Sequence, residues 1–148
     1  MYTKILVPID GSATAVKGLN EAIKLAKALK AKVKLIHVVN ELLGDYTLAP
    51  SVYYEKIIDA ERQAGRATLA NAQAYARSLD FEVEVELIET IGARASTIIV
   101  EAAKQSGADL IVMGTHGRRG LQRLALGSDA ELVLRSAPVP VLMVRDAA

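Results

Sequence analysis

The sequence predicts an α/β fold, in which a parallel sheet carries helices on both of its faces. Short apolar runs of strand length alternate with longer stretches whose apolar residues recur every three or four positions. The chain has 148 residues, a usual size for one domain, and it shows no linker, low-complexity tract or internal repeat. We therefore expect a single domain over residues 1–148, built in the order β-α-β-α-β-α-β-α-β.

The first part of the chain predicts two strands with one helix between them. Lys4–Ile9 is a short apolar run that ends at the turn residues Asp10-Gly11-Ser12. From Ser12 onward an amphipathic helix is indicated by four apolar residues at helical spacing, Val16, Leu19, Ile23 and Ala26. Lys32–Val39 is the second strand, and the residues from 40 to about 52 contain the glycine and proline of a loop.

The middle of the chain predicts a long helix, an edge strand and a second, shorter helix. The long helix is indicated by five residues at spacings of three and four, Gly65, Leu69, Ala72, Ala76 and Leu79. Phe81–Glu89 alternates apolar and acidic residues, as expected of an edge strand with one solvated side. Residues 93–106 have the spacing of a helix, and Gly107 is its expected end.

The last part of the chain predicts two strands around one helix. Asp109–Gly114 is apolar almost throughout, as expected of a strand at the centre of a parallel sheet. Ser128–Arg135 is the last predicted helix, and Val139–Arg145 is the last strand.

Composition and charge exclude several classes of function. The net charge of +1 provides no field for nucleic acid or an anionic membrane, and the chain has no Trp and only one Phe to stack on bases. Without Cys there are no disulfides, thiolate metal sites or thiol nucleophiles. The apolar runs are too short for a signal peptide or a membrane span, so we expect a cytoplasmic protein.

Two stretches are candidates for a ligand site, because ligands of open α/β sheets bind beyond the carboxyl ends of the strands. One stretch is Pro8–Ser12, after the first strand, and the other begins at Met113, at the end of the fourth. The second is rich in Arg and contains Gly114, Gly117 and Gly127, which favours an anion close to the backbone. The sequence alone does not decide whether the first and fourth strands are neighbours.

Ser128 has two competing interpretations. Ser128 and Glu131 have the spacing of a capping box, in which the serine hydroxyl accepts from the Glu131 N–H. The start of a helix also offers free N–H groups that suit phosphate, to which Ser128 would donate its hydroxyl and its N–H.

These motifs resemble the nucleotide-binding branch of the universal stress protein family. Gly114-x2-Gly117-x9-Gly127-Ser128 matches the family signature G-x2-G-x9-G-(S/T), and KILVPIDGS, VKLIHVV and LRSAPVPVLMVR are similar to its other segments. The resemblance implies a three-layer, doubly wound, five-stranded parallel sheet in the order 3-2-1-4-5, like that of the adenine nucleotide alpha hydrolases. It thereby implies that the first and fourth strands are neighbours.

The resemblance also implies an ATP site. Asp10 would contact the ribose, and Pro8, Ile9 and Val38 would flank the adenine, with Val38 offering main-chain groups to its edge. Met113 and Gly114 would lie under the ribose and phosphates. Gly117, Gly127 and Ser128 would hold the triphosphate, with Mg²⁺ bound through it. Arg118 could offset part of the negative charge of the phosphates. Asp129 departs from the small or apolar residue common in the family, and it would repel phosphate unless it points away or helps to hold Mg²⁺. Asp10 has a structural alternative, in which it caps the first helix or its turn.

We expect a nucleotide-binding module that forms a homodimer and responds to stress, and no catalytic residue. There is no P-loop, G-x-S-x-G elbow or H-E-x-x-H motif. In the family two copies of the last strand pair across a two-fold axis, which here implies an interface at Val139, Val141 and Met143. A weakly ATP-hydrolysing enzyme and a dimeric interaction protein that binds no nucleotide remain as alternatives. The sequence does not identify a protein partner.

Overall fold

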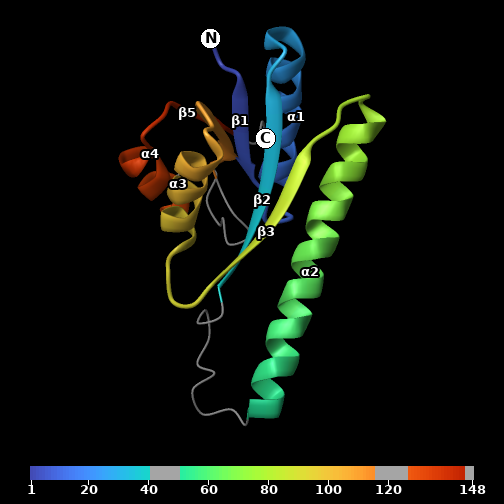
Figure 1. Ribbon diagram of the computed structural model, residues 1–148, viewed down its shortest axis with the longest axis vertical. Helices are drawn as coiled ribbons and strands as arrows, with labels where there is room; N and C mark the ends of the chain where they lie inside the picture. Colours follow the sequence, from blue (N-terminus) through green and yellow to red (C-terminus); the bar gives the residue numbers. More distant parts are fainter. Residues whose placement is uncertain (41–50, 116–126, 146–148) are drawn as a thin grey trace.

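Five strands form one parallel sheet in the order β3-β2-β1-β4-β5 (Figure 1). The structure, a computed structural model, describes residues 1–40, 51–115 and 127–145. The strands are β1 Lys4–Pro8, β2 Lys32–Asn40, β3 Glu84–Thr90, β4 Leu110–Gly114 and β5 Val141–Val144. The helices are α1 Ala13–Leu29, α2 Ser51–Ser78, α3 Ala95–Ser106 and α4 Ser128–Ser136.

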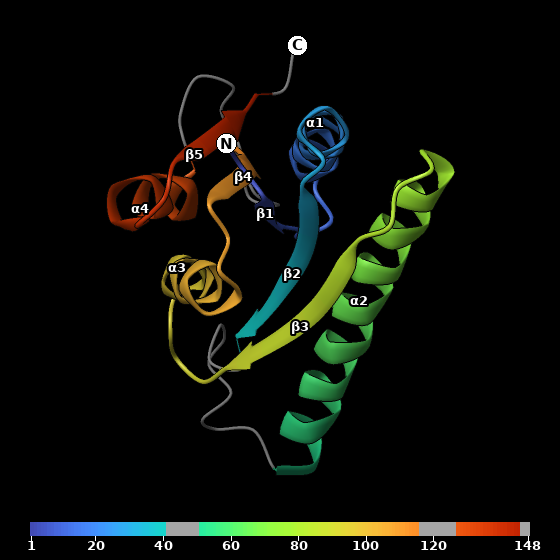
Figure 2. The same cartoon turned by 45° about the horizontal axis from the view of Figure 1, so that its top comes forward.

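The sheet is the middle of three layers, with α1 and α2 on one face and α3 and α4 on the other (Figure 2). This confirms the predicted α/β class and the strand order that the family resemblance implied. It also answers the question left open by the sequence, because β1 pairs directly with β4, with Ile5 opposite Leu110 and Leu6 opposite Ile111. The carboxyl ends of β1 and β4 therefore lie side by side at the same edge of the sheet.

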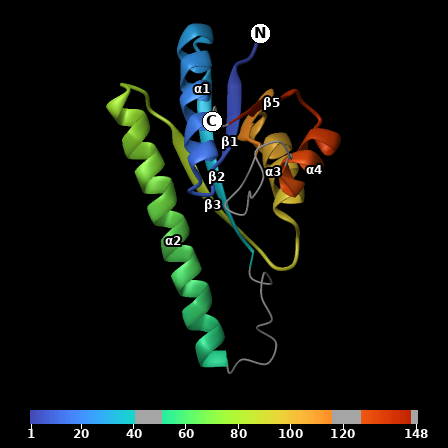
Figure 3. The ribbon, with the colours of Figure 1, turned by 180° about the vertical axis from the view of Figure 1, so that it is seen from behind.

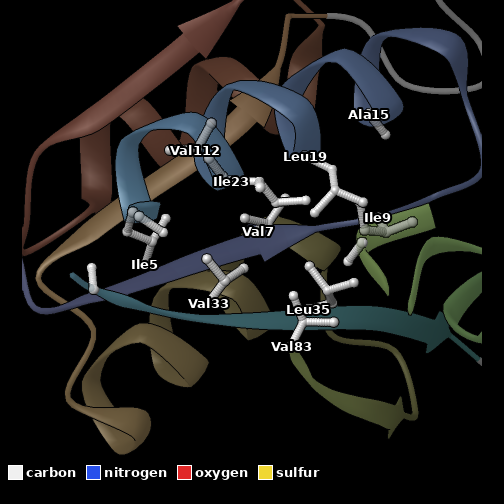
Figure 4. Packing of buried hydrophobic residues seen from close by; sticks show 14 of the residues in the cluster. Ile5, Val7, Ile9, Ala15, Leu19, Ile23, Val33, Leu35, Val83 and Val112 are labelled. Carbon is white, nitrogen blue, oxygen red and sulfur yellow. The ribbon is translucent and has the colours of Figure 1, made fainter. Parts of the chain in front are cut away.

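The core consists of two apolar clusters, one on each face of the sheet. In β1, Ile5 and Val7 pack under α1, as Figure 4 shows, whereas Leu6 between them belongs to the cluster under α3 and α4. All three are fully buried. Burial on both faces explains why the central strands are continuous apolar runs and not alternating ones.

The edge strand β3 begins later than the sequence predicts. The expected strand began at Phe81, but the N–H of Phe81 donates to Ala76 O at 3.0 Å and so closes the last turn of α2. The strand itself starts at Glu84, and its position at the edge of the sheet is as predicted.

The helix α2 is longer than its neighbours and runs past the carboxyl ends of the strands (Figures 1 and 3). Its 28 residues correspond to a length of about 42 Å. It starts at Ser51, inside the segment predicted as a loop, most of which, residues 41–50, lies outside the described residues.

At the opposite, amino end of the sheet, Asp109 ties β4 to the start of β1. Its carboxylate accepts hydrogen bonds from Thr3 N–H at 2.8 Å, from the Thr3 hydroxyl at 2.8 Å and from Lys4 N–H at 3.0 Å. Partial burial by itself raises the pKa of Asp109, but these hydrogen bonds outweigh it, and the pKa is lowered below the usual aspartate value.

Asp109→Asn is expected to lower the free energy of unfolding at pH 7 by about 1–2 kcal/mol, because the amide NH₂ faces donors and cannot accept from them. A lowered folded-state pKa stabilises the protein above the unfolded pKa of about 4, and this contribution is lost as the pH falls through the folded pKa. The difference between wild type and variant should therefore shrink below pH 4.

Urea titrations at pH 7 and pH 3 measure this difference. Glu101→Gln, an exposed carboxylate on α3, is the control that should change nothing at either pH. A constant difference between wild type and Asp109→Asn at both pH values would contradict the role of the ionised carboxylate.

Candidate functional site

The turn after β1 holds Asp10 at the carboxyl edge of the sheet. The Oδ1 atom of Asp10 accepts a hydrogen bond from Ser12 N–H at 2.9 Å, and the Ser12 hydroxyl in turn accepts from Ala15 N–H at 3.2 Å. Between them Gly11 has a φ of +86°, which favours glycine. Asp10 thus supports the turn, as its structural alternative predicted, while Ser12 is the N-cap of α1.

The adenine candidates lie on two neighbouring strand ends. Pro8 is the last residue of β1, and Ile9 follows it with 4% of its surface exposed. Val38 lies near the end of β2, beyond the last pair between β1 and β2, which joins Pro8 to Ile36. These three residues are therefore adjacent at the edge between β1 and β2.

At the end of β4, Met113 is buried, and Gly114 lies against the first turn of α1. A Cβ atom on Gly114 would lie 2.8 Å from Cβ and Oγ1 of Thr14 and 2.9 Å from the Thr14 carbonyl carbon. Gly114 is therefore required by the close approach of α1 to β4, whatever ligand binds nearby. The family signature predicted a position under the ribose and phosphates for this glycine, and its packing role was not predicted.

The predicted capping box at the start of α4 does not form. The N-cap of α4 is Gly127, and the Glu131 N–H donates to Gly127 O at 2.9 Å. The Glu131 carboxylate instead forms an ion pair with Arg135 at 2.9 Å. The cause is a tertiary hydrogen bond, from Gly127 N–H to Thr115 O at 2.6 Å, which fixes where the chain enters the helix.

Ser128 is consequently the first helical residue, and its side chain is exposed. Within the described part of the chain no side chain caps the amino end of α4. Asp129, which follows, is half-exposed in the same first turn. The hydroxyl and the N–H groups at this end are thus not used by a capping box.

The structure brings most of the predicted site residues to one rim. The ends of β1 and β4 are adjacent, and the bond between Gly127 and Thr115 places the start of α4 beside the end of β4. Gly117 and Arg118 lie outside the described residues. In the described segments no group of three or more His, Asp or Glu side chains could hold a metal ion, and none of their helices is long and apolar enough to cross a membrane.

The residues predicted for a dimer interface lie at or just before the edge strand β5. The side chains of Val139, Val141 and Met143 pack against the cluster under α3 and α4, and Leu142 is the exposed one, at 38%. Pro140 O accepts a hydrogen bond from Ile111 N–H of β4, and Val144 O accepts one from Thr115 N–H, directly after β4. Because main-chain groups alternate in a parallel strand, those of Val141 and Met143 face away from the sheet.

One residue of this rim was overlooked in the sequence. His37 is buried in β2, and its Nδ1 lies 2.7 Å from Ile9 O. The sequence placed it only within the predicted strand Lys32–Val39. A histidine inside the apolar run KLIHVV must find a polar partner when it is buried, and this was the available signal.

Known proteins are similar to this chain in sequence and in fold. The model of the universal stress protein family matches residues 1–145. A universal stress protein of Methanocaldococcus jannaschii is 36% identical over 146 residues, which cover 98% of this chain and 83% of that protein.

Solved structures share the fold. The universal stress protein UspA from Lactobacillus plantarum superposes with a TM-score of 0.85 at 29% identity, covering 97% of this chain and 98% of the other. A universal stress protein in complex with cAMP has a TM-score of 0.69 at 26% identity, covering 97% of each chain. The protein from Archaeoglobus fulgidus in complex with dAMP has the same TM-score and identity, covering 97% of this chain and 98% of the other.

Proposed function

Because the chain belongs to the universal stress protein family, we propose that it binds an adenine nucleotide at this rim and acts as a nucleotide-responsive module in the response to stress. The observation that carries the proposal is the meeting of three features, namely the Asp10 turn, the end of β4 and the uncapped start of α4. A carboxylate beside a free helix N-terminus provides a hydrogen-bond acceptor for ribose and donors for phosphate. The complexes of relatives with cAMP and dAMP support the same class of ligand.

Each predicted site residue has a role in this proposal. Asp10 accepts hydrogen bonds from the ribose hydroxyls, Pro8, Ile9 and Val38 surround the adenine, and Met113 and Gly114 lie beneath the ribose. The phosphates contact Gly117, Arg118, Gly127 and Ser128, and Mg²⁺ binds through the phosphates of ATP with Asp129 close to it. The absence of a serine cap favours this role for Ser128, since its hydroxyl is not used by the helix.

Calorimetric titration with AMP, cAMP and ATP, each with and without Mg²⁺, tests the proposal. We expect micromolar binding, about −8 kcal/mol, for at least one of these, and no comparable binding of CMP. The purified protein should also be extracted and any bound nucleotide identified first. No binding and no extracted nucleotide would contradict the proposal and leave the interaction protein as the alternative.

We also propose that two copies pair through β5, because the outward main-chain groups of Val141 and Met143 form an open sheet edge. Leu142→Arg is expected to halve the mass measured by light scattering, since two arginines would face each other across the two-fold axis. Val85→Arg is the matched control, because Val85 is equally exposed, at 39%, on the opposite edge strand. A Leu142→Arg protein with the wild-type dimer mass would contradict the β5 interface.

A further inference from the structure

We propose that His37 is a positioning residue that frees the main chain of Val38 to recognise adenine. The inference rests on the proposed function, in which Val38 offers its main-chain groups to the edge of the adenine, and it adds a role for His37 that the family resemblance did not imply. It starts from the hydrogen bond between His37 Nδ1 and Ile9 O, 2.7 Å long and buried. A carbonyl oxygen can only accept, so the Nδ1 atom of His37 carries the hydrogen.

The bond lies where the β1–β2 ladder stops. Ile9 N–H still donates to Ile36 O at 2.8 Å, in the ordinary pattern of parallel strands. In that pattern the next bond would run from Val38 N–H to Ile9 O. No such bond is present among the main-chain hydrogen bonds of residues 1–40. The Ile9 carbonyl accepts instead from the imidazole of His37.

The position of the imidazole explains the change. Val33 and Leu35 pack with α1 and α2, so His37, two residues further along β2, projects to the same face. Ile9 O is therefore turned out of the sheet toward α2. Val38 N–H and C=O keep the direction of Ile36 and face the space beyond the end of β1.

The helix α2 holds the imidazole in this position. A Cβ atom on Gly65 would lie 2.7 Å from His37 Cδ2, 3.2 Å from His37 Nε2 and 2.8 Å from Leu87 Cδ1. Only glycine therefore lets the helix approach the imidazole so closely. His37 is confined between the α2 backbone on one side and the Ile9 carbonyl on the other.

The Val38 N–H and C=O, which form no main-chain hydrogen bond with the described residues that follow β1, can distinguish adenine from hypoxanthine, the base of IMP. The N–H can donate to N1 of adenine, and the C=O can accept from the 6-amino group. Hypoxanthine presents the reverse pattern: its N1–H is a donor and its oxygen at position 6 is an acceptor. The ratio of AMP to IMP affinity therefore reports whether the Val38 main chain is available.

The test compares His37→Leu with His37→Asn by titration with AMP and IMP. Leucine removes the donor, so that Ile9 O can return to Val38 N–H, and the AMP-over-IMP preference should fall about tenfold, the value of one hydrogen bond. Asparagine carries an NH₂ near the position of Nδ1 and should retain the preference. A purely structural role would weaken both nucleotides equally and leave their ratio unchanged.

Gly65→Ala provides a second variant in case His37→Leu does not fold. Alanine favours the helix but pushes the imidazole away from Ile9, so the preference should fall although His37 is intact. The inference is overturned if His37→Leu or Gly65→Ala folds and keeps the wild-type ratio of AMP to IMP affinity.

NMR tests the inference without any ligand, and so separates its failure from failure of the proposed function. The ¹⁵N shifts of His37 should show the proton on Nδ1. The Val38 amide should exchange rapidly in the wild type and become protected in His37→Leu. A Val38 amide as protected in the wild type as that of Ile36 would overturn the role of His37, whether or not AMP binds.

Discussion

Replacing Asp10 by Asn is expected to weaken AMP binding by about 10- to 100-fold while the turn after β1 stays intact. The loss corresponds to about 1.5–3 kcal/mol, the value of hydrogen bonds to a charged acceptor. The asparagine Oδ1 can still accept from Ser12 N–H, as Asp10 does at 2.9 Å, so the local structure is conserved. The substitution therefore separates the proposed contact with ribose from the observed support of the turn.

Titration with AMP and with 2′,3′-dideoxy-AMP makes this measurement specific to the sugar. The wild type should prefer AMP, and Asp10→Asn should bind the two ligands about equally. Ser12→Ala is the control, since it removes the N-cap of α1 at a cost of about 1 kcal/mol in stability but keeps the carboxylate. If Asp10→Asn kept the preference of the wild type, Asp10 would be a turn residue alone.

Gly114→Val is expected to lower the free energy of unfolding by about 2–4 kcal/mol, although valine is the better strand former. The new Cβ would lie 2.8 Å from the Thr14 side chain and 2.9 Å from its carbonyl carbon. A side chain can rotate away from such a contact, but backbone cannot, so α1 would have to move away from β4. Urea denaturation followed by circular dichroism measures the change.

The matched control lies on the other side of the same contact. A Cβ on Gly18 of α1 would meet Gly114 N at 3.5 Å, an ordinary contact, and alanine favours a helix by about 1 kcal/mol over glycine. Gly18→Ala should therefore be neutral or stabilising. Equal stability of Gly114→Val and Gly18→Ala would show that α1 and β4 separate easily, against the packing described here.

The sequence predicts the elements of this fold well because their signals are local. Continuous apolar runs identify β1 and β4 as buried on both faces, and the alternation from Phe81 onward identifies an edge strand. The strand order did not follow from the residues themselves and came from the family resemblance. Without it, the adjacency of β1 and β4 could not be deduced, because no local pattern records which parallel strands pair.

The wrong predictions concern residues whose hydrogen-bond partners no local sequence pattern records. Ser128 has the spacing of a helix cap, but the bond between Gly127 and Thr115 makes Gly127 the N-cap and Ser128 the first helical residue. Phe81 has the pattern of a strand, but its N–H completes the end of α2. His37 became meaningful only once Ile9 and Gly65 were placed around it.

The contact between Gly114 and Thr14 bears on how such signatures evolve. A residue that the architecture itself requires is under selection in every descendant, including those that have abandoned the ligand. The first glycine of the signature should therefore persist in lineages that have lost nucleotide binding, whereas Gly117 should drift there. Classifying a newly sequenced relative as a binder by its first glycine would consequently overcount binders, and the later positions are the ones that carry the information.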